Sequence, residues 1–148
     1  MGFNGYTDNY EKLLPEDDAA TQNIHINNFI FHMPTVEDFD ELIQYTTTKW
    51  YNITNPYLGI KGLTGKLFIS KINGNEVFFP VTGKIETKLN SRITSIIGKN
   101  TSIDLWTSDI YSNCNYSYQY KGGETTNTIT SEFRFYGMPV RGILNLNE

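Results

Sequence analysis

The most regular hydrophobic pattern in the chain lies between residues 35 and 45. Four apolar residues recur at the three- and four-residue spacing of a helix and are expected to face the core: Val36, Phe39, Leu42 and Ile43. Thr35 precedes them and Asp38 follows three residues later, which resembles a capping box with Asp in place of Glu or Gln. Residues 46–48 are β-branched threonines, so the helix is predicted to end near Tyr45.

After Trp50 the pattern changes to that of strands. Residues 66–72 and 76–81 flank Asn73-Gly74-Asn75, and because Asn-Gly favours the positive φ angles of a tight turn, they predict a hairpin. Four apolar residues are expected to share one face of this hairpin: Leu67, Ile69, Val77 and Phe79. Pro80 cannot donate a backbone hydrogen bond, so we expect it at a strand end or a sheet edge.

Further strands are predicted in the second half of the chain, over residues 103–107, 115–120, 132–136 and 140–144. Tyr116, Tyr118 and Tyr120 alternate with polar residues, so one face of their strand is expected to be aromatic. Residues 83–104 predict a long loop with a short element at 93–97. A helix followed by antiparallel strands predicts an α+β fold.

Length and composition limit the classes of protein. A chain of 148 residues fits one domain, and an aromatic content of 14% argues against disorder. Only 19% of residues are charged and the net charge is −4, so no nucleic-acid partner is expected. No apolar run is long enough to span a bilayer and no leader pattern is visible, so neither membrane insertion nor a signal peptide is predicted. The acidic residues gather in positions 1–50. They form either a solvated acidic face or a charge asymmetry that orients the chain against a charged neighbour.

Catalytic and metal-binding patterns are weak. The single Cys114 excludes an intrachain disulfide and a cysteine-based zinc site, and no cation lies near it in the sequence. The acidic residues 16–18 offer oxygen ligands for Ca²⁺ but match no EF-hand, and a solvated turn after Pro15 is the alternative. Asp104 and Asp109 could act as a glycosidase pair, although the sequence does not fix their separation. We therefore predict no metal, no cofactor and no enzymatic activity.

By contrast, residues 109–136 have the composition of a binding surface. Tyr, Ser, Asn and Gly dominate this segment, as they do in antibody loops, because Tyr gives rigid contact area and small polar residues give adaptable hydrogen bonds. The predicted ligand-binding residues are Asp109, Tyr111, Asn113, Asn115, Tyr116, Tyr118, Tyr120, Asn127 and Arg134. The alternative is an aromatic core strand flanked by polar loops.

Several motifs hold their order and spacing from about residue 10 to residue 144. The runs PEDDAA at 15–20, MPT at 33–35 and FDELI at 39–43 resemble the "PEDDAA…MPT…EFxELI" pattern of a Bacteroidetes family. The run NGNEVFFPVTG at 73–83 resembles its "NGNxIFLPAAG", LWTS at 105–108 its "YWSS", and YGMPVR at 136–141 its "YGFSVRPV". This is the Fibrobacter succinogenes major paralogous domain family. It has the C-type-lectin-like fold of formylglycine-generating enzymes and of the variable proteins of diversity-generating retroelements.

The resemblance implies a single C-type-lectin-like domain over residues 1–148, with Trp106 and residues 137–141 in a rigid frame below a variable surface. Enzymatic relatives use cysteines to activate their substrate, and with only Cys114 that activity is not implied here. Family members begin with a strand upstream of the PEDDAA run, which residues 1–14 do not supply. We therefore expect an exposed sheet edge or N-terminal arm that pairs with a partner chain in an oligomer.

Cellular relatives tend to be surface lipoproteins with signal peptides and additional domains, and this sequence shows neither pattern. The expected function is that of a non-enzymatic virion protein of a phage that infects Bacteroidetes. Such a head or tail component would contact a cell-surface glycan or protein from the particle surface. The alternatives are a purely structural joining or decoration protein of the virion, and an adhesin domain on the surface of a Bacteroidetes host cell.

Overall fold

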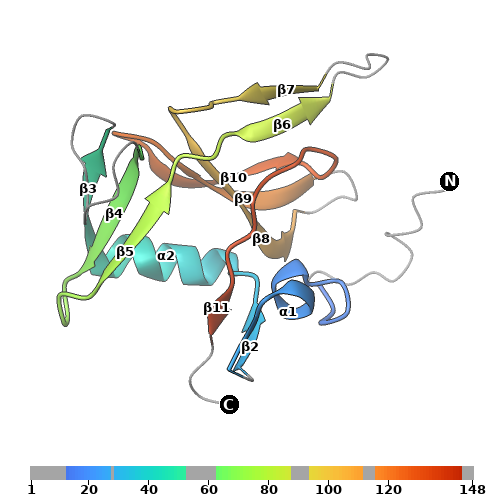
Figure 1. Ribbon diagram of the computed structural model, residues 1–148, viewed down its shortest axis with the longest axis horizontal. Helices are drawn as coiled ribbons and strands as arrows, with labels where there is room; N and C mark the ends of the chain where they lie inside the picture. Colours follow the sequence, from blue (N-terminus) through green and yellow to red (C-terminus); the bar gives the residue numbers. More distant parts are fainter. Residues whose placement is uncertain (1–12, 28, 53–62, 88–93, 112–115, 145–148) are drawn as a thin grey trace, which may run out of the picture.

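The computed structural model describes residues 13–27, 29–52, 63–87, 94–111 and 116–144, and the fold is described for these residues. It is α+β, as predicted, with two helices and antiparallel strand pairs (Figure 1). The helices are α1 (Ala19–Asn23) and α2 (Val36–Tyr45). The sheets are β1 (His25–Ile26), β2 (Phe29–His32) and β11 (Ile143–Leu144); β3 (Thr46–Tyr51), β4 (Gly65–Ser70) and β5 (Glu76–Pro80); β6 (Lys84–Thr87) and β7 (Thr94–Ile97); and β8 (Ile103–Ile110), β9 (Tyr116–Gly122) and β10 (Asn127–Phe133).

Helix α2 has the bounds and the cap that the sequence predicts. The Thr35 side chain accepts a hydrogen bond from the Asp38 backbone N–H at 3.1 Å, and the Asp38 carboxylate accepts one from the Thr35 N–H at 2.7 Å. This reciprocal pair satisfies two backbone donors that the first turn would otherwise leave free. After Tyr45 the chain passes directly into β3, because the threonines that open this strand favour an extended backbone.

The predicted hairpin is present as β4 and β5, with β3 paired to the other side of β4. Gly74 lies in the turn with a φ of 74°, a conformation that a residue with a Cβ rarely adopts. Pro80 ends β5, which is an outer strand of its sheet, as a residue without a backbone donor should.

The expected shared face of this hairpin is wrong. The register pairs Phe68 with Val77 and so joins an even-numbered residue to an odd-numbered one. Leu67 and Ile69 therefore lie on the face opposite to that of Val77 and Phe79. The register of a hairpin depends on how many residues its turn contains. A shift of one residue in the pairing moves every side chain of a strand to the opposite face of the sheet.

The hydrophobic core lies where α2 and the β3–β4–β5 sheet meet the β8–β9–β10 sheet (Figure 1). Its buried members are Phe39, Phe68, Phe79, Ile103, Leu105 and Tyr120. Half-buried hydrophobic residues pack against them: Leu42, Ile43, Trp50, Val77, Val81 and Ile129. Of the four residues predicted to form the core face of the helix, Phe39 is thus in the core and Leu42 and Ile43 pack against it, while Val36 lies half-buried at the first turn.

Several strand boundaries differ from those predicted. β8 continues to Ile110, and β10 covers residues 127–133 instead of 132–136. The chain turns after β10, where the Tyr136 N–H donates to the Phe133 carbonyl at 3.0 Å. Only the end of the predicted strand at 140–144 is extended, as β11. Each strand ends where its neighbouring strand no longer offers hydrogen-bond partners. The local hydrophobic pattern does not contain that information.

The expectation of a long loop over residues 83–104 is also wrong. This segment contains β6 and β7, of which only β7 matches the predicted short element, and they pair with each other in a hairpin. Ile85 forms a backbone bridge with Gly137, more than fifty residues away, so tertiary pairing stabilises a segment with little strand pattern of its own.

At the start of the described chain, residues 15–17 form the expected turn, but Asp18 is buried. Its carboxylate accepts hydrogen bonds from Ala20 and Thr21, which caps α1, and from the Met33 N–H at 2.8 Å. Asp18 therefore fastens α1 to the segment that enters α2. Most of the predicted N-terminal arm lies outside the described residues.

The outer edge of β8 is covered by other parts of the same chain. The Ser102 carbonyl accepts hydrogen bonds from the N–H groups of Thr82 and Gly83, and the Trp106 N–H donates to the Pro139 carbonyl. The bond to Pro139 brings residues 137–141 alongside β8, and Arg141 reaches β5, where it donates to the Phe78 carbonyl. Within the part of the chain that the structure describes, β3 and β10 each have a strand on one side only.

Candidate functional site

Six aromatic rings form a continuous group at one end of the β8–β9–β10 sheet. We call it the outer aromatic cluster, and its members are Tyr111, Tyr116, Tyr118, Phe133, Phe135 and Tyr136. Tyr111 meets Tyr118 edge-on with ring centroids 5.2 Å apart, and Tyr116 stacks on Phe133 at 4.5 Å. Phe133 in turn stacks on Phe135 at 5.0 Å. These separations are those of favourable ring pairs, so the rings hold one another in place.

The strand register explains how the cluster forms. Tyr116 and Phe133 are direct partners across β9 and β10, so their side chains share a face. Tyr118 lies on the same face, two residues along β9. The turn after β10 then brings Phe135 and Tyr136 back against Phe133.

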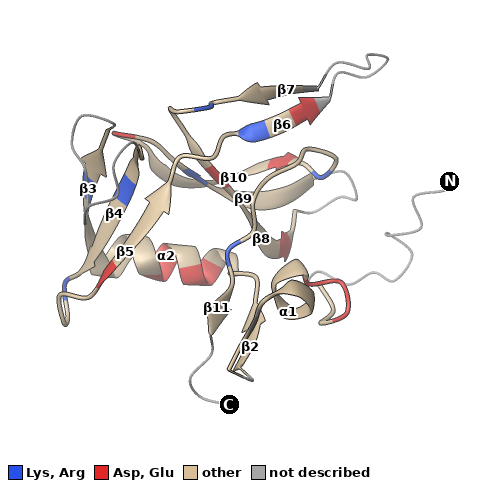
Figure 2. Ribbon diagram, in the orientation of Figure 1, with Lys and Arg blue, Asp and Glu red and all other residues tan. Residues whose placement is uncertain are grey.

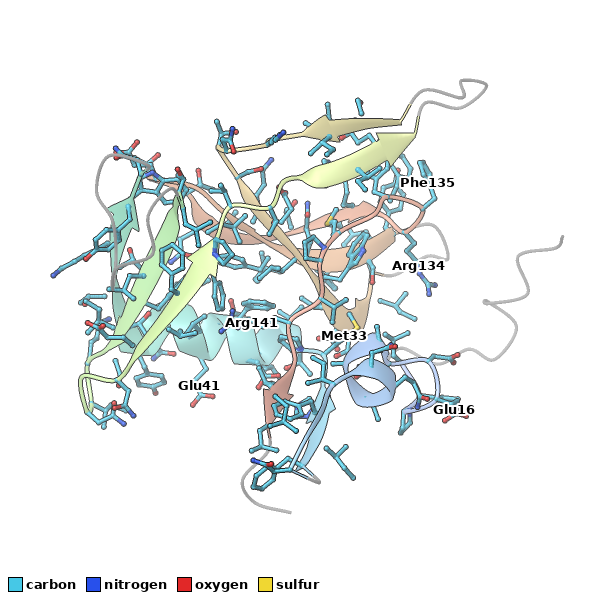
Figure 3. The ribbon with its side chains drawn as sticks, viewed as in Figure 1. Glu16, Met33, Glu41, Arg134, Phe135 and Arg141 are labelled. Atoms are coloured by element: carbon cyan, nitrogen blue, oxygen red, sulfur yellow. The ribbon has the colours of Figure 1, made fainter. Side chains whose placement is uncertain are left out.

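The cluster reaches the surface of the protein. Tyr111 is 38% exposed and Phe135 is 47% exposed, while the other four rings are half-buried. Phe135 and Arg134 follow β10 in the chain and lie away from α2, with their side chains pointing in different directions (Figure 3). The arrangement offers ring faces and phenol groups to a ligand on a support of antiparallel strands.

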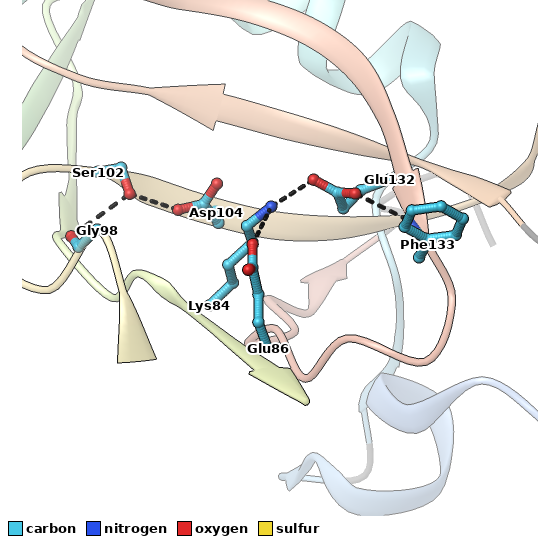
Figure 4. A network of polar contacts seen from close by, with 7 residues as sticks. All are labelled: Lys84, Glu86, Gly98, Ser102, Asp104, Glu132 and Phe133. Carbon is cyan, nitrogen blue, oxygen red and sulfur yellow. Dashed lines mark hydrogen bonds and ion pairs between the residues drawn. The ribbon is translucent and has the colours of Figure 1, made fainter. Parts of the chain in front are cut away.

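Charged groups border the cluster on the side of β6. The Lys84 ammonium lies 4.8 Å from the centre of the Tyr136 ring, pairs with Glu86 at 3.0 Å and also pairs with Glu132 (Figure 4). Burial alone would lower the pKa of Lys84, but the hydrogen bonds and charges of the two carboxylates outweigh it and raise the pKa. Burial and the same carboxylates also raise the pKa of the Tyr136 phenol. A ligand at this border would meet a charged rim next to apolar rings.

The two aspartates of the glycosidase interpretation have structural partners. Asp104 is 2% exposed and accepts a hydrogen bond from the Ser102 hydroxyl (Figure 4). Asp109 accepts a hydrogen bond from the backbone N–H of Val36 at 2.6 Å, at the first residue of α2. A carboxylate there satisfies a free donor and interacts favourably with the helix dipole. Asp109, predicted to bind ligand, is therefore seen to hold the helix start to β8.

Tyr120 was predicted to contact ligand together with its neighbours, and this is wrong. Its ring is 0% exposed and stacks on Phe39 with centroids 4.9 Å apart. Asn127, also in the predicted set, accepts a hydrogen bond from the Tyr120 hydroxyl at 2.6 Å. Alternation correctly places Tyr120 on the same face as Tyr116 and Tyr118, but α2 covers that end of the face.

The remaining predicted residues divide between those that the structure brings to the cluster or near it and those that are not described. Tyr111, Tyr116 and Tyr118 come together in the cluster, and Arg134 lies in the turn after β10, with its side chain pointing away from Phe135 (Figure 3). Asn113 and Asn115, and with them Cys114, lie outside the described residues.

Four residues of the site were not predicted to bind ligand: Lys84, Phe133, Phe135 and Tyr136. Three of them are aromatic residues of a short run, Phe133-Arg134-Phe135-Tyr136, and this density was a usable signal. Lys84 gave no local signal, because only the tertiary fold brings β6 to the end of β10.

In the described parts of the chain, no three His, Cys, Asp or Glu side chains gather in a way that could hold a metal ion. The same residues include no helix with the length and apolarity needed to cross a membrane. Comparisons of the chain with family models, with curated proteins and with solved structures found no match.

Proposed function

We propose that this protein is a non-enzymatic binding module and that the outer aromatic cluster is its ligand-binding surface. The observation that carries the proposal is the unbroken series of ring contacts from Tyr118 to Tyr136, which reaches the surface at Tyr111 and Phe135. An exposed apolar group of this kind at the end of a packed sheet is typical of interaction sites.

The physical case rests on rigidity. Tyrosine and phenylalanine lose little rotational freedom on binding, and rings already fixed by their neighbours lose less. Sugar rings and apolar side chains both fit flat against such faces, while phenol groups supply hydrogen bonds. Each contact is weak, so effective attachment would depend on many copies acting together.

Within the α+β class, we propose the C-type-lectin-like fold that the sequence motifs imply, with the cluster on its ligand-bearing side. The proposed setting is the surface of a phage particle, where the module would bind a glycan or protein of a Bacteroidetes host. This setting rests on the sequence motifs, and the aromatic surface supports the binding part of the proposal.

A second candidate function is that of a structural joining protein in the virion. The observation that favours it is the exposed apolar pair on one face of the β6–β7 hairpin, where the direct partners Ile85 and Ile96 are 46% and 54% exposed. Such a surface suits permanent burial against a neighbour in an assembly.

The first test is cell binding by the Tyr111→Ala and Phe135→Ala variants, which remove the two most exposed rings of the cluster. Both should keep the thermal stability of the parent protein and lose at least about tenfold in apparent affinity for host cells, because aromatic anchors dominate such interfaces. Tyr45→Ala is the matched control, since Tyr45 is 43% exposed but lies at the end of α2. Folded cluster variants that bind cells as the parent does would refute the binding role.

The setting is tested separately, by mass spectrometry of purified particles of the phage whose genome encodes the chain. Detection in stoichiometric amounts supports the virion location. Absence from the particles contradicts the virion location. The binding role is then judged from the cell-binding result alone.

A further inference from the structure

A cavity separate from the outer aromatic cluster lies between β5, β8 and residues 139–141. Its volume is about 140 Å³. Phe79, Ile103, Leu105 and Val140 supply mostly apolar walls, and Arg141 supplies a cation. None of these residues belongs to the outer aromatic cluster.

The Arg141 side chain is only partly exposed, and its guanidinium has few partners. It lies over the Phe79 ring at 4.6 Å from the ring centre and donates one long hydrogen bond, of 3.4 Å, to the Phe78 carbonyl. Figure 3 shows Arg141 between β5 and the chain that enters β11. Among the described residues the ion pairs both belong to Lys84, and no carboxylate pairs with Arg141.

A partly buried guanidinium without a counter-ion is unusual. Arginine has five N–H donors, and a buried charge is normally paired because removing it from water is costly. This burial lowers the pKa of Arg141. The ring of Phe79 stabilises one face of the guanidinium by a cation–π contact, but it accepts none of the in-plane N–H groups. The site therefore retains donors directed in the plane of the guanidinium that Phe79 cannot satisfy.

A carboxylate matches these donors. Its two oxygens accept parallel hydrogen bonds from the arginine fork, and its charge supplies a counter-ion that the described residues do not provide. The other cavity group capable of hydrogen bonding, the Thr82 hydroxyl, already exchanges hydrogen bonds with the Asp104 backbone. Beyond the carboxylate, the apolar walls favour a ligand with a small hydrocarbon group.

We propose that this cavity is a binding site for a carboxylate that carries a small apolar group, with Arg141 as the residue that binds the carboxylate. Apolar cavities of about 150 Å³ hold a molecule the size of benzene, so a hydrocarbon group of a few carbon atoms fits this one. Such a group is found in a free short-chain acid and at the C-terminus of a polypeptide that ends in valine.

The test is titration of the full chain with sodium isobutyrate, followed by NMR and calorimetry, with isobutyramide as the neutral control. Isobutyrate should bind and shift the Arg141 Nε–H resonance, and isobutyramide should bind at least about tenfold more weakly, because charge-assisted hydrogen bonds to the guanidinium carry the affinity. Binding of the acid and amide with equal affinity, or of neither, would overturn the proposal.

Two variants sharpen this result. Arg141→Met keeps the aliphatic stem over Phe79 and should lose isobutyrate binding at least tenfold, whereas Lys121→Met removes an exposed cation of β9 and should leave it unchanged. Equal affinity in parent and Arg141→Met contradicts the assignment. If Arg141→Met does not fold, the shift of the Arg141 resonance in the parent protein decides the question.

A second arm distinguishes the sources of the carboxylate. A short peptide that ends in valine with a free C-terminus is compared with its C-terminal amide. Tighter binding of the free peptide than of isobutyrate supports a polypeptide ligand, and binding of isobutyrate alone supports a small free acid.

Discussion

The two ends of strand β9 carry the same side chain on the same face and use it differently. Tyr120 is buried at the inner end, and Tyr116 and Tyr118 are half-buried at the outer end. The three tyrosines have the same residue type and the same place in the strand alternation. Neither property therefore decides whether a tyrosine is part of the core or of the outer aromatic cluster. The difference is what lies opposite: α2 covers the inner end of the face, and other rings near the surface accompany the outer end.

The inner end is a packed environment in every direction. Tyr120 stacks on Phe39 and meets Phe68 and Phe79 edge-on, with both centroid distances 6.2 Å. Its hydroxyl has one partner, the Asn127 side chain. At the outer end, by contrast, ring pairs supply the contacts of Tyr116 and Tyr118. A ring at the inner end should therefore matter for stability, and a ring at the outer end for binding.

The largest expected effect is that of Tyr120→Ala. Removing this buried ring leaves a cavity in the core, and such truncations of large aromatic residues cost about 3–5 kcal/mol of unfolding free energy. Urea denaturation followed by circular dichroism measures the loss. The matched outer variant, Tyr116→Ala, should lose less than half as much. Equal losses at the two positions would remove the distinction between the two ends.

Tyr120→Phe isolates the hydroxyl of the inner ring. We expect a loss of about 1–2 kcal/mol at neutral pH, because the Asn127 oxygen keeps its burial and loses its donor. Burial raises the pKa of Tyr120 above the ordinary value of 10.0. Above that pH the unfolded chain releases the proton and the folded one retains it, so parent stability falls as pH rises. The difference between parent and variant should therefore shrink above pH 10, and a difference that stays constant would contradict a buried phenol.

The sequence predicted those parts of the fold whose signals are local. The capping box at Thr35 and Asp38, the helix end at Tyr45 and the Asn-Gly turn at Gly74 each depend on a few adjacent residues, and the structure has all of them. What failed depends on partners distant in the chain. Ile85 of β6, for example, pairs with Ile96 of β7 and also bridges to Gly137, more than fifty residues along the chain.

The same distinction applies to the candidate site. Composition placed Tyr111, Tyr116 and Tyr118 in one candidate set, and the structure brings their rings into contact. Composition could not separate Tyr120 from them, since alternation fixes the face of a strand but not what packs on each part of it. Nor could it assign Asp109 to the start of α2, which lies 73 residues earlier.

Asp109→Ala should have a smaller effect on stability than either change at Tyr120. The Val36 N–H loses its acceptor at the start of α2, and the loss of a side chain that caps a helix typically costs about 1 kcal/mol. Asp109→Asn keeps an acceptor oxygen and should retain most of the stability. Denaturation of both variants, with cell binding measured in parallel, separates the roles. Loss of binding by Asp109→Ala at parental stability would return this residue to the ligand-binding set.

The smallest expected effect completes the comparison along β9. Tyr116→Phe and Tyr118→Phe remove hydroxyls whose rings are held by other rings, so each should change the unfolding free energy by less than about 0.5 kcal/mol. Their effect should appear in binding instead, because within the described parts of the chain neither hydroxyl has a hydrogen-bond partner, which leaves both available to a ligand. Thermal unfolding and cell adsorption of the two variants, measured beside Tyr120→Phe, give the pattern that distinguishes the ends. A ligand that stacks on the rings without touching the phenol groups would bind Tyr116→Phe and Tyr118→Phe as it binds the parent protein, but would bind Tyr111→Ala more weakly. Adsorption of these variants therefore also distinguishes contact with the ring faces from contact with the hydroxyls.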